Sequence, residues 1–135
     1  MGLDICGRNP VSPVGVHFRT TNSRWGALVR YLFTIAPKIA STCVYWYTSD
    51  GDGLNYAAAV RLAGRLEVEI DSGRAAEYQK EHPHWPCSEC NGGTRNDVAS
   101  CENCRGRGNV PNHFEIHDAQ DFLKFLKVCG GFSVS

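Results

Sequence analysis

Two pairs of cysteines are the residues whose types and spacing indicate the clearest chemistry in this sequence. Cys87 and Cys90 form one Cys-x-x-Cys turn, and Cys101 and Cys104 form a second turn after ten intervening residues. Each turn can present two thiolates to one metal ion, and two turns complete the tetrahedral four-sulfur shell of structural zinc sites. Because the set contains no histidine or carboxylate, the spacing predicts one structural zinc ion rather than a catalytic metal.

The glycines that follow the cysteines extend the motif. Gly92 follows the first pair, while Gly106 and Gly108 follow the second, so the segment resembles the Cys-x-x-Cys-x-Gly-x-Gly repeats of the cysteine-rich zinc domain of DnaJ-type co-chaperones. The second repeat fits fully, whereas the first has Thr94 where the last glycine belongs. The resemblance covers residues 87–108 only and implies a hairpin-like lobe with one zinc ion. It does not imply chaperone activity, because two of the four repeats and the His-Pro-Asp loop of a J-domain are missing from the sequence.

Two other chemistries use cysteine pairs of this kind. A redox-active Cys-x-x-Cys motif is one of them, but two pairs with trailing glycines outside a βαβ pattern do not favour it. A four-cysteine iron–sulfur cluster is the other, and the residue types alone permit it. Zinc is the metal that the spacing and the glycines favour.

The composition is typical of a soluble globular domain. The chain has 135 residues, of which 42% are hydrophobic and 21% charged, and its formal net charge is zero. This balance excludes a global electrostatic attraction to nucleic acid or membranes. The most apolar segment, residues 25–39, is interrupted by Arg30, Pro37 and Lys38, so it is too short and too charged to cross a bilayer. Four of the seven cysteines belong to the metal motif, which favours a reducing compartment, so we expect a cytoplasmic protein without membrane contact.

The elements that must position the cysteines are mainly helices. Apolar residues at helical spacing predict helices over residues 22–36, 54–71, 74–81 and 118–129. Asn22 or Ser23 is the expected cap of the first helix, which Pro37 ends or kinks. Asp118 is the expected cap of the last helix.

The helix over residues 54–71 shows the clearest division into two faces. Ala59, Leu62, Ala63, Leu66 and Ile70 form its apolar face. Glu69 is expected to face water and to pair with Arg65 one turn away. The preceding turn, residues 49–53, contains Asp52 as a candidate cap. A calcium loop is a weaker interpretation of this turn, because Arg61 occupies the position of its closing carboxylate.

Short strands complete the expected fold. Residues 2–6, 14–18, 43–48 and 113–117 have the composition of strands. The fold class is therefore α+β: a small helix-rich single domain with a few short strands. Residues 1–86 and 109–135 form its body, and the zinc-binding lobe, residues 87–108, is inserted before the C-terminal strand and helix.

The N-terminal third contains two candidate binding surfaces. Arg19, Arg24 and Arg30 lie among aromatic residues, a pattern that can bind single-stranded nucleic acid by charge and stacking. The same pattern also fits arginines that are simply solvated around a buried Trp25. The aromatic stretch Tyr45-Trp46-Tyr47 is, with the zinc lobe, a candidate surface for a protein partner.

Residues 1–72 also carry a second, vaguer resemblance. In several short stretches they resemble uncharacterised small proteins of bacteria and their phages, a family that implies no catalytic residues. The matching stretches are Gly2-Leu3-Asp4-Ile5, Gly15-x-x-Phe18-Arg19, Tyr45-Trp46 and Asp50-Gly-Asp52-Gly-Leu54.

The leading interpretation is a non-catalytic, zinc-containing binding protein with a protein partner. The resemblance to phage proteins suggests that it modulates or inhibits a host machine such as a defence complex. Nucleic-acid binding through the N-terminal arginines is the alternative. An enzyme whose catalytic residues come together only in the folded chain is the second alternative.

Overall fold

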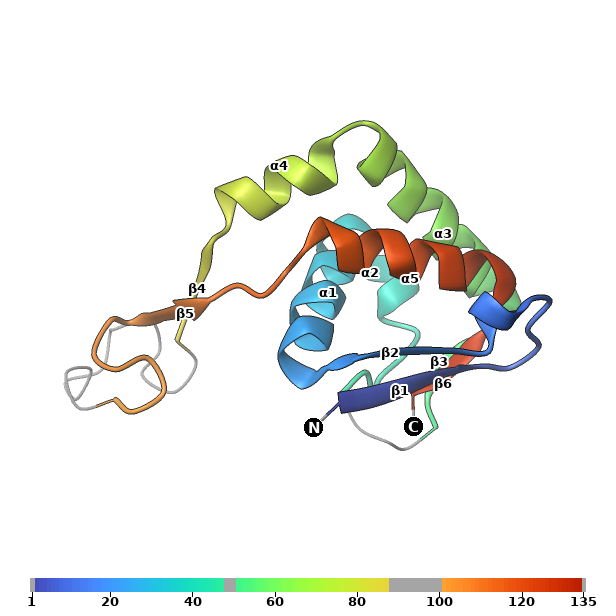
Figure 1. Cartoon of the computed structure of the whole chain (residues 1–135), viewed down its shortest axis with the longest axis horizontal. Coiled ribbons are helices and arrows are strands. Elements are labelled where there is room, and N and C mark those ends of the chain that lie inside the picture. The colour runs from blue at the N-terminus through green and yellow to red at the C-terminus, as the bar shows by residue number, and fades with distance from the viewer. Residues whose placement is uncertain (1, 48–50, 88–100, 135) are drawn as a thin grey trace.

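A four-stranded antiparallel sheet with helices packed on one face forms the body of the protein (Figure 1). The computed structural model describes residues 2–47, 51–87 and 101–134. The strand order in the sheet is β2-β1-β6-β3. These strands are β1 (Gly2–Gly7), β2 (His17–Thr21), β3 (Gly53–Leu54) and β6 (Phe132–Val134). The α+β class is confirmed, with about half of the described residues helical.

The sheet brings the two ends of the described chain together. β1 pairs with β2, so that Ile5 lies opposite Phe18, and on its other edge it pairs with β6. A short 3-10 helix, η1 (Pro13–Gly15), lies between β1 and β2. The predicted strand over 14–18 therefore begins later, at His17, because η1 takes up its first residues.

Five α-helices complete the described fold, and all four predicted helical segments are confirmed. They are α1 (Asn22–Ile35), α2 (Pro37–Ala40), α3 (Tyr56–Asp71), α4 (Arg74–Glu81) and α5 (Ile116–Val128). None of the helices in the described part of the chain is long and apolar enough to traverse a lipid bilayer.

The ends of α1 follow from its capping residues. Thr21 is the cap, one residue earlier than expected, and its Oγ1 accepts a hydrogen bond from the backbone N–H of Arg24 at 3.3 Å. At the other end Ala36 leaves the helical conformation. Pro37 cannot continue α1 because it lacks a backbone N–H, and it takes the first position of α2, where no N–H is needed. The step between these two helices exposes part of their apolar side chains.

One prediction for helix α3, the exposure of Glu69 to water, is wrong. Four of the five residues of its predicted apolar face are buried and Ile70 is half-buried, but Glu69 is only 4% exposed rather than facing water. The carboxylate is compensated by two guanidinium groups: Arg65 lies at 2.9 Å, the predicted pair, and Arg74 of α4 lies at 2.9 Å. A buried carboxylate is tolerated only with such partners, and here it ties α4 to α3.

Two predicted strands are absent from the described structure. Residues 43–47 form turns rather than a strand, because Trp46 is buried in the core and Asp52 binds the backbone N–H groups of Val44 and Tyr45 at 2.8 and 3.0 Å. Residues 113–115 have no strand partner, and α5 already begins at Ile116.

The core between sheet and helices is aromatic. Trp25 of α1 packs against Phe122 of α5 at a ring distance of 5.5 Å, and Phe122 packs against Phe132 of β6 at 5.9 Å. Trp25 also donates a hydrogen bond from Nε1 to the carbonyl of Trp46 at 2.7 Å. These contacts join α1, α5 and the sheet into one hydrophobic core.

A two-stranded ribbon projects from this body (Figure 1). Its strands are β4 (His84–Pro86) and β5 (Asn109–Pro111), which pair antiparallel with Trp85 opposite Val110. The strands enclose the sequence segment predicted to be the zinc lobe. We call the described residues 84–87 and 101–111 the hairpin arm.

Candidate metal centre

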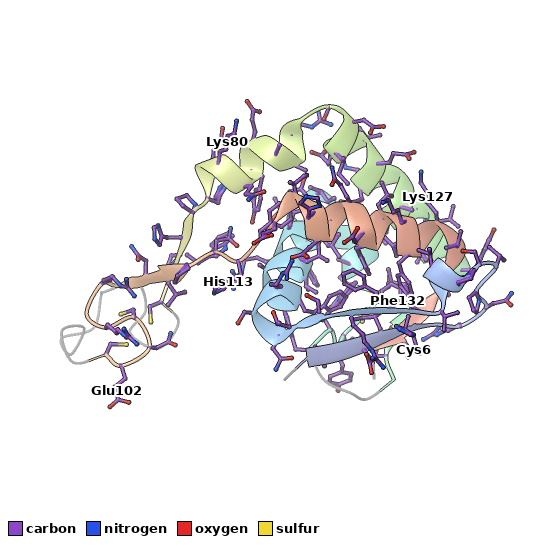
Figure 2. The ribbon with its side chains drawn as sticks, in the orientation of Figure 1. Cys6, Lys80, Glu102, His113, Lys127 and Phe132 are labelled. Atoms are coloured by element: carbon purple, nitrogen blue, oxygen red, sulfur yellow. The ribbon has the colours of Figure 1, made fainter. Side chains whose placement is uncertain are left out.

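Three of the four predicted metal ligands lie together in the hairpin arm. The sulfur atoms of Cys87, Cys101 and Cys104 all lie within 4.8 Å of one another, and those of Cys87 and Cys101 are 3.8 Å apart. Figure 2 shows sulfur atoms close to Glu102, on the part of the arm away from the body. Cys90 lies outside the described residues, so the fourth ligand stays a prediction.

The chemistry of this cluster fits a thiophilic metal ion. Cys87 and Cys104 are fully buried and Cys101 is half-buried, so the sulfurs face one another rather than solvent. Thiolates are the ligands that zinc and iron–sulfur clusters use in closed sites. The structure thus confirms a cysteine cluster able to hold a metal ion, and the identity of the metal stays a prediction.

The glycine turn after Cys104 points a backbone donor at the metal ligands. Arg105, Gly106 and Gly108 have φ angles of 55°, 80° and 78°, a left-handed conformation that favours glycine. This curl places the N–H of Gly108 at 3.2 Å from the sulfur of Cys104. An N–H donor stabilises a thiolate, so the turn supports metal binding by Cys104.

Asn103 is a supporting residue that the sequence motif did not single out. Its Nδ2 donates a hydrogen bond to the sulfur of Cys87 at 3.2 Å. The backbone N–H of Cys87 donates to the carbonyl of Gly108 at 2.9 Å, which joins the start and end of the arm. Asn103 occupies a variable position inside Cys-x-x-Cys, and no pattern in the sequence signals its role.

Stacked side chains attach the arm to the body. The ring of His82 stacks on Tyr78 at 4.4 Å and on Trp85 of β4 at 5.9 Å. Arg30 of α1 places its guanidinium carbon 4.5 Å from the centre of the Trp85 ring. Asn112 adds a hydrogen bond to the carbonyl of His82 at 2.7 Å. These contacts fix the base of the arm against α1 and α4.

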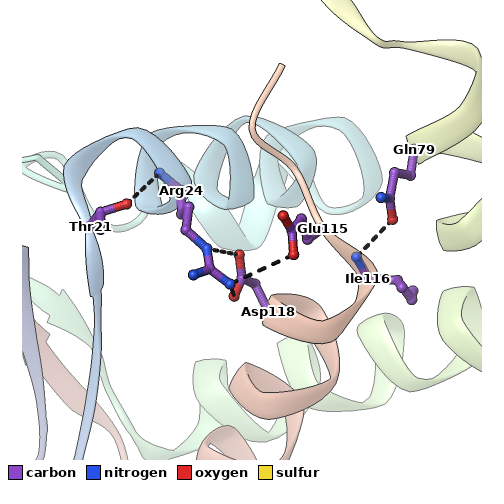
Figure 3. A network of polar contacts seen from close by, with 6 residues as sticks. All are labelled: Thr21, Arg24, Gln79, Glu115, Ile116 and Asp118. Atoms are coloured by element: carbon purple, nitrogen blue, oxygen red, sulfur yellow. Dashed lines mark hydrogen bonds and ion pairs between the residues drawn. The ribbon is translucent and has the colours of Figure 1, made fainter. Parts of the chain in front are cut away.

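The three candidate nucleic-acid-binding arginines each have a different partner in the structure. Arg19 pairs with Asp4 at 2.6 Å. Arg24 binds both carboxylate oxygens of Asp118, at 2.9 and 2.6 Å, as Figure 3 shows. Arg30, six residues along α1 from Arg24, lies about a third of a turn away on the helix surface. Two of the three positive charges are therefore offset by acids of the same chain.

The pair of Arg24 and Asp118 connects α1 to α5. Hydrogen bonding to Asp118 is the main cause that raises the pKa of Arg24 above its ordinary value. Glu115 adds a weaker contact at 3.7 Å (Figure 3). Glu115 is the cap residue of α5, so Asp118, the predicted cap, lies in the first turn instead. A carboxylate in the first turn is also stabilised by the positive end of the helix dipole.

The aromatic candidate surface is split by burial. Tyr45 and Tyr47 are 54% and 59% exposed, as a contact surface requires. Trp46 is 1% exposed, and its Nε1 donates to the carbonyl of Ala40 at 2.9 Å. Trp46 is thus a core residue, and its prediction as part of the candidate surface is wrong.

The other described cysteines lie in the body, away from the arm. Cys43 and Cys129 are buried, and burial raises the pKa of the Cys43 thiol to about 12 and that of Cys129 above its ordinary value. These two thiols stay protonated and pack as small apolar groups. Cys6 in β1 is half-buried.

Comparisons of the chain with protein-family models, with curated proteins and with solved structures found no match.

Proposed function

We propose that Cys87, Cys90, Cys101 and Cys104 hold one structural zinc ion and that the protein is a non-catalytic binding protein whose hairpin arm contacts a protein partner. The observation that carries the proposal is the cluster of three thiols, two of them fully buried and one half-buried, in an arm that projects from the body. An all-sulfur site has no open position for a substrate or water, so its metal shapes the chain rather than reacting.

The surface of the arm supports a role in recognition. Most of its described side chains beyond the cysteines are exposed, among them Glu102, Arg105 and Arg107. A segment that buries little besides metal ligands presents most of its side chains to solvent. Four thiolates leave a bound zinc ion with net negative charge, which offsets the two arginines. This balance favours a protein partner over the phosphate backbone of a nucleic acid, which needs a surplus of positive charge.

The identity of the partner belongs to the same proposal. The resemblance of residues 1–72 to small bacterial and phage proteins suggests a host machine, such as a defence complex, that the protein binds and modulates. Zinc would hold the arm in its binding shape without taking part in any reaction.

Metal content and partner capture test the proposal together. We expect elemental analysis of the purified protein to find about one zinc ion per chain. We expect the wild-type protein to retain a partner stoichiometrically from host lysate, and a variant with Arg105→Glu and Arg107→Glu to lose it. Lys80→Glu combined with Lys124→Glu, two exposed positions on the body, is the control with the same change in net charge. A chain without metal, or capture that is the same for all three proteins, would contradict the proposal.

A further inference from the structure

A second surface on the body has the character of a docking site. A groove of about 470 Å³ lies between residues 35–39, at the junction of α1 and α2, and Arg61 and Arg65 of α3. Its volume is within the range of ligand-binding pockets. None of Cys87, Cys101 and Cys104, the described cysteines of the candidate metal centre, lines it.

The break between α1 and α2 forms the floor of this groove. Ala36 has φ −145° and ψ 62°, and Pro37 cannot continue the helix, so the chain steps sideways. The step leaves the side chains of Ile35 and Ile39 only half-buried. Arg65 holds the junction in place, because its Nε donates to the carbonyl of Ile35 at 3.1 Å. The floor is therefore apolar.

The rim of the groove has an excess of positive charge. Within the described chain, the side chains of Lys38 and Arg61 form no hydrogen bond or ion pair. Arg65 pairs with Glu69, but this single carboxylate also serves Arg74, so two positive charges share one negative charge. Three cationic groups thus surround an apolar floor with too few acids to balance them.

An exposed apolar stripe on α3 extends this surface. Tyr56, Val60 and Val68 are 67%, 47% and 49% exposed. They are spaced by multiples of four residues and therefore lie along one side of the helix, with Gly64 between them. A side chain at Gly64 would meet no atom within 4 Å, so the stripe is open to a partner. Arg61 is three residues from Gly64 and Arg65 three from Val68, which places the stripe beside the basic rim.

We propose that this groove and stripe dock an acidic amphipathic segment of a protein partner. Leucine-like side chains of that segment would enter the groove over Ile35 and Ile39, and its carboxylates would pair with Lys38 and Arg61. Charge complementarity selects this occupant, because the floor is apolar and the uncompensated rim charges are all positive. The inference rests on the proposed function, since it specifies the chemistry of the protein partner.

A random 12-residue peptide library, selected on the immobilised full-length protein, tests the occupant directly. We expect enriched peptides to combine Asp or Glu with Leu, Ile or Phe, and to bind less tightly as salt rises. In fluorescence anisotropy, Lys38→Glu combined with Arg61→Glu should weaken their binding at least about tenfold. The Lys80→Glu and Lys124→Glu control should change it less than about twofold, because these charges lie outside the groove.

Several results would overturn this inference. They are the absence of any enriched peptide, enrichment of basic peptides, or equal binding to the groove variant and the control. Dimers in sedimentation that the groove variant abolishes would assign the surface to a second copy instead. A salt-sensitive complex with nucleic acid at Lys38 and Arg61 would also exclude the acidic segment.

The outcome is separable from that of the metal-centre proposal. A Cys101→Ser variant should lose metal but keep peptide binding, because the groove lies on the body. Partner capture that depends on Arg105 and Arg107 while no peptide binds the groove would leave the proposed function standing and remove this inference alone.

Discussion

The body and the hairpin arm of this protein are held together by different means. The body has a continuous core, in which Trp25, Phe122 and Phe132 contact one another and bury their rings completely. The described part of the arm has a separate, much smaller cluster, made of Cys87, Cys104 and the partly buried Cys101 and Val110. The arm thus buries mainly sulfur atoms where the body buries aromatic rings.

This difference indicates what each region needs in order to fold. Burial of a large aromatic side chain stabilises a fold by about 2–3 kcal/mol, and the body has many such side chains. Two buried cysteines, with Cys101 and Val110 partly buried beside them, cannot offset the entropy of ordering the described part of the arm. A metal ion bound by the cysteines would supply the missing stabilisation in one step. The comparison therefore predicts two regions that fail under different treatments.

Removal of the metal should have the largest effect, and it should be confined to the arm. Structural zinc contributes on the order of 10 kcal/mol to a small module. We expect Cys104→Ser, or excess chelator, to abolish zinc binding. The amide signals of residues 101–111 in ¹H–¹⁵N spectra should then lose their chemical-shift dispersion. Signals of α1, α3 and α5 should keep their positions. Cooperative unfolding of the whole chain on chelation would contradict the separation of the two regions.

Truncation of an aromatic ring in the core should destabilise the body and leave metal binding by the arm intact. Phe122 is fully buried and contacts Trp25, Phe18 and Phe132. We expect Phe122→Ala to lower the free energy of unfolding in urea by about 3–5 kcal/mol. The arm of the folded fraction should still bind metal. Tyr56→Ala, at an exposed position, is the control and should change stability by less than about 0.5 kcal/mol. Equal effects of the two substitutions would show that the core is misassigned.

The two regions also differ in what their sequences reveal. The helices of the body are predictable because long runs of apolar residues recur at helical spacing, as in α3. The cysteine cluster is predictable because ligand spacing is nearly independent of the surrounding fold. What escapes prediction depends on distant contacts: Trp46 has a β-prone neighbourhood, yet it turns into the core, where its carbonyl accepts a hydrogen bond from Trp25.

Contacts of polar side chains are a second class of feature that sequence patterns miss. The charge of Glu69 predicts that it faces water, although it lies seven residues after Leu62 and therefore on the same side of α3. Arg65 and Arg74 of α4 compensate its buried carboxylate. Asn103 has no distinguishing neighbours in the sequence, and its bond to the Cys87 sulfur depends on the curl of the arm. Each of these assignments needs the three-dimensional arrangement of charges and donors.

Loss of the Asn103 amide should weaken the metal centre without abolishing it. Residues that hydrogen-bond to metal ligands typically contribute 10–100-fold to metal affinity. We expect Asn103→Ala to lower zinc affinity by about that factor in competition with a chromophoric chelator. Glu102→Ala is the matched control, because Glu102 is the exposed neighbour and has no hydrogen bond to a described side chain. Equal affinity of the Asn103 variant and the control would remove Asn103 from the site.

The smallest expected effect concerns Asp52, which stabilises the turns of the body rather than its core. Its carboxylate accepts hydrogen bonds from the backbone N–H groups of Val44, Tyr45 and Gly53 at 2.8, 3.0 and 2.8 Å. Helix α3 is capped instead by Asn55, so Asp52 does not act as the predicted cap. These bonds lower the pKa of Asp52, the bond from Tyr45 contributing most. Asp52→Ala should cost about 1–2 kcal/mol at neutral pH.

The lowered pKa sets the pH range of this contribution. A carboxyl group with a folded pKa below its unfolded value of about 3.9 stabilises the fold above that value. The stability is lost as pH falls from about 4 through the folded pKa, because protonation of the carboxylate weakens its bonds to the N–H groups. The difference in unfolding free energy between wild type and Asp52→Asn, measured in urea at pH 7 and at pH 3, should therefore shrink at the lower pH. Metal binding by the arm at neutral pH should be the same in both proteins. A difference that stays constant between the two pH values would show that Asp52 acts through its shape rather than its charge.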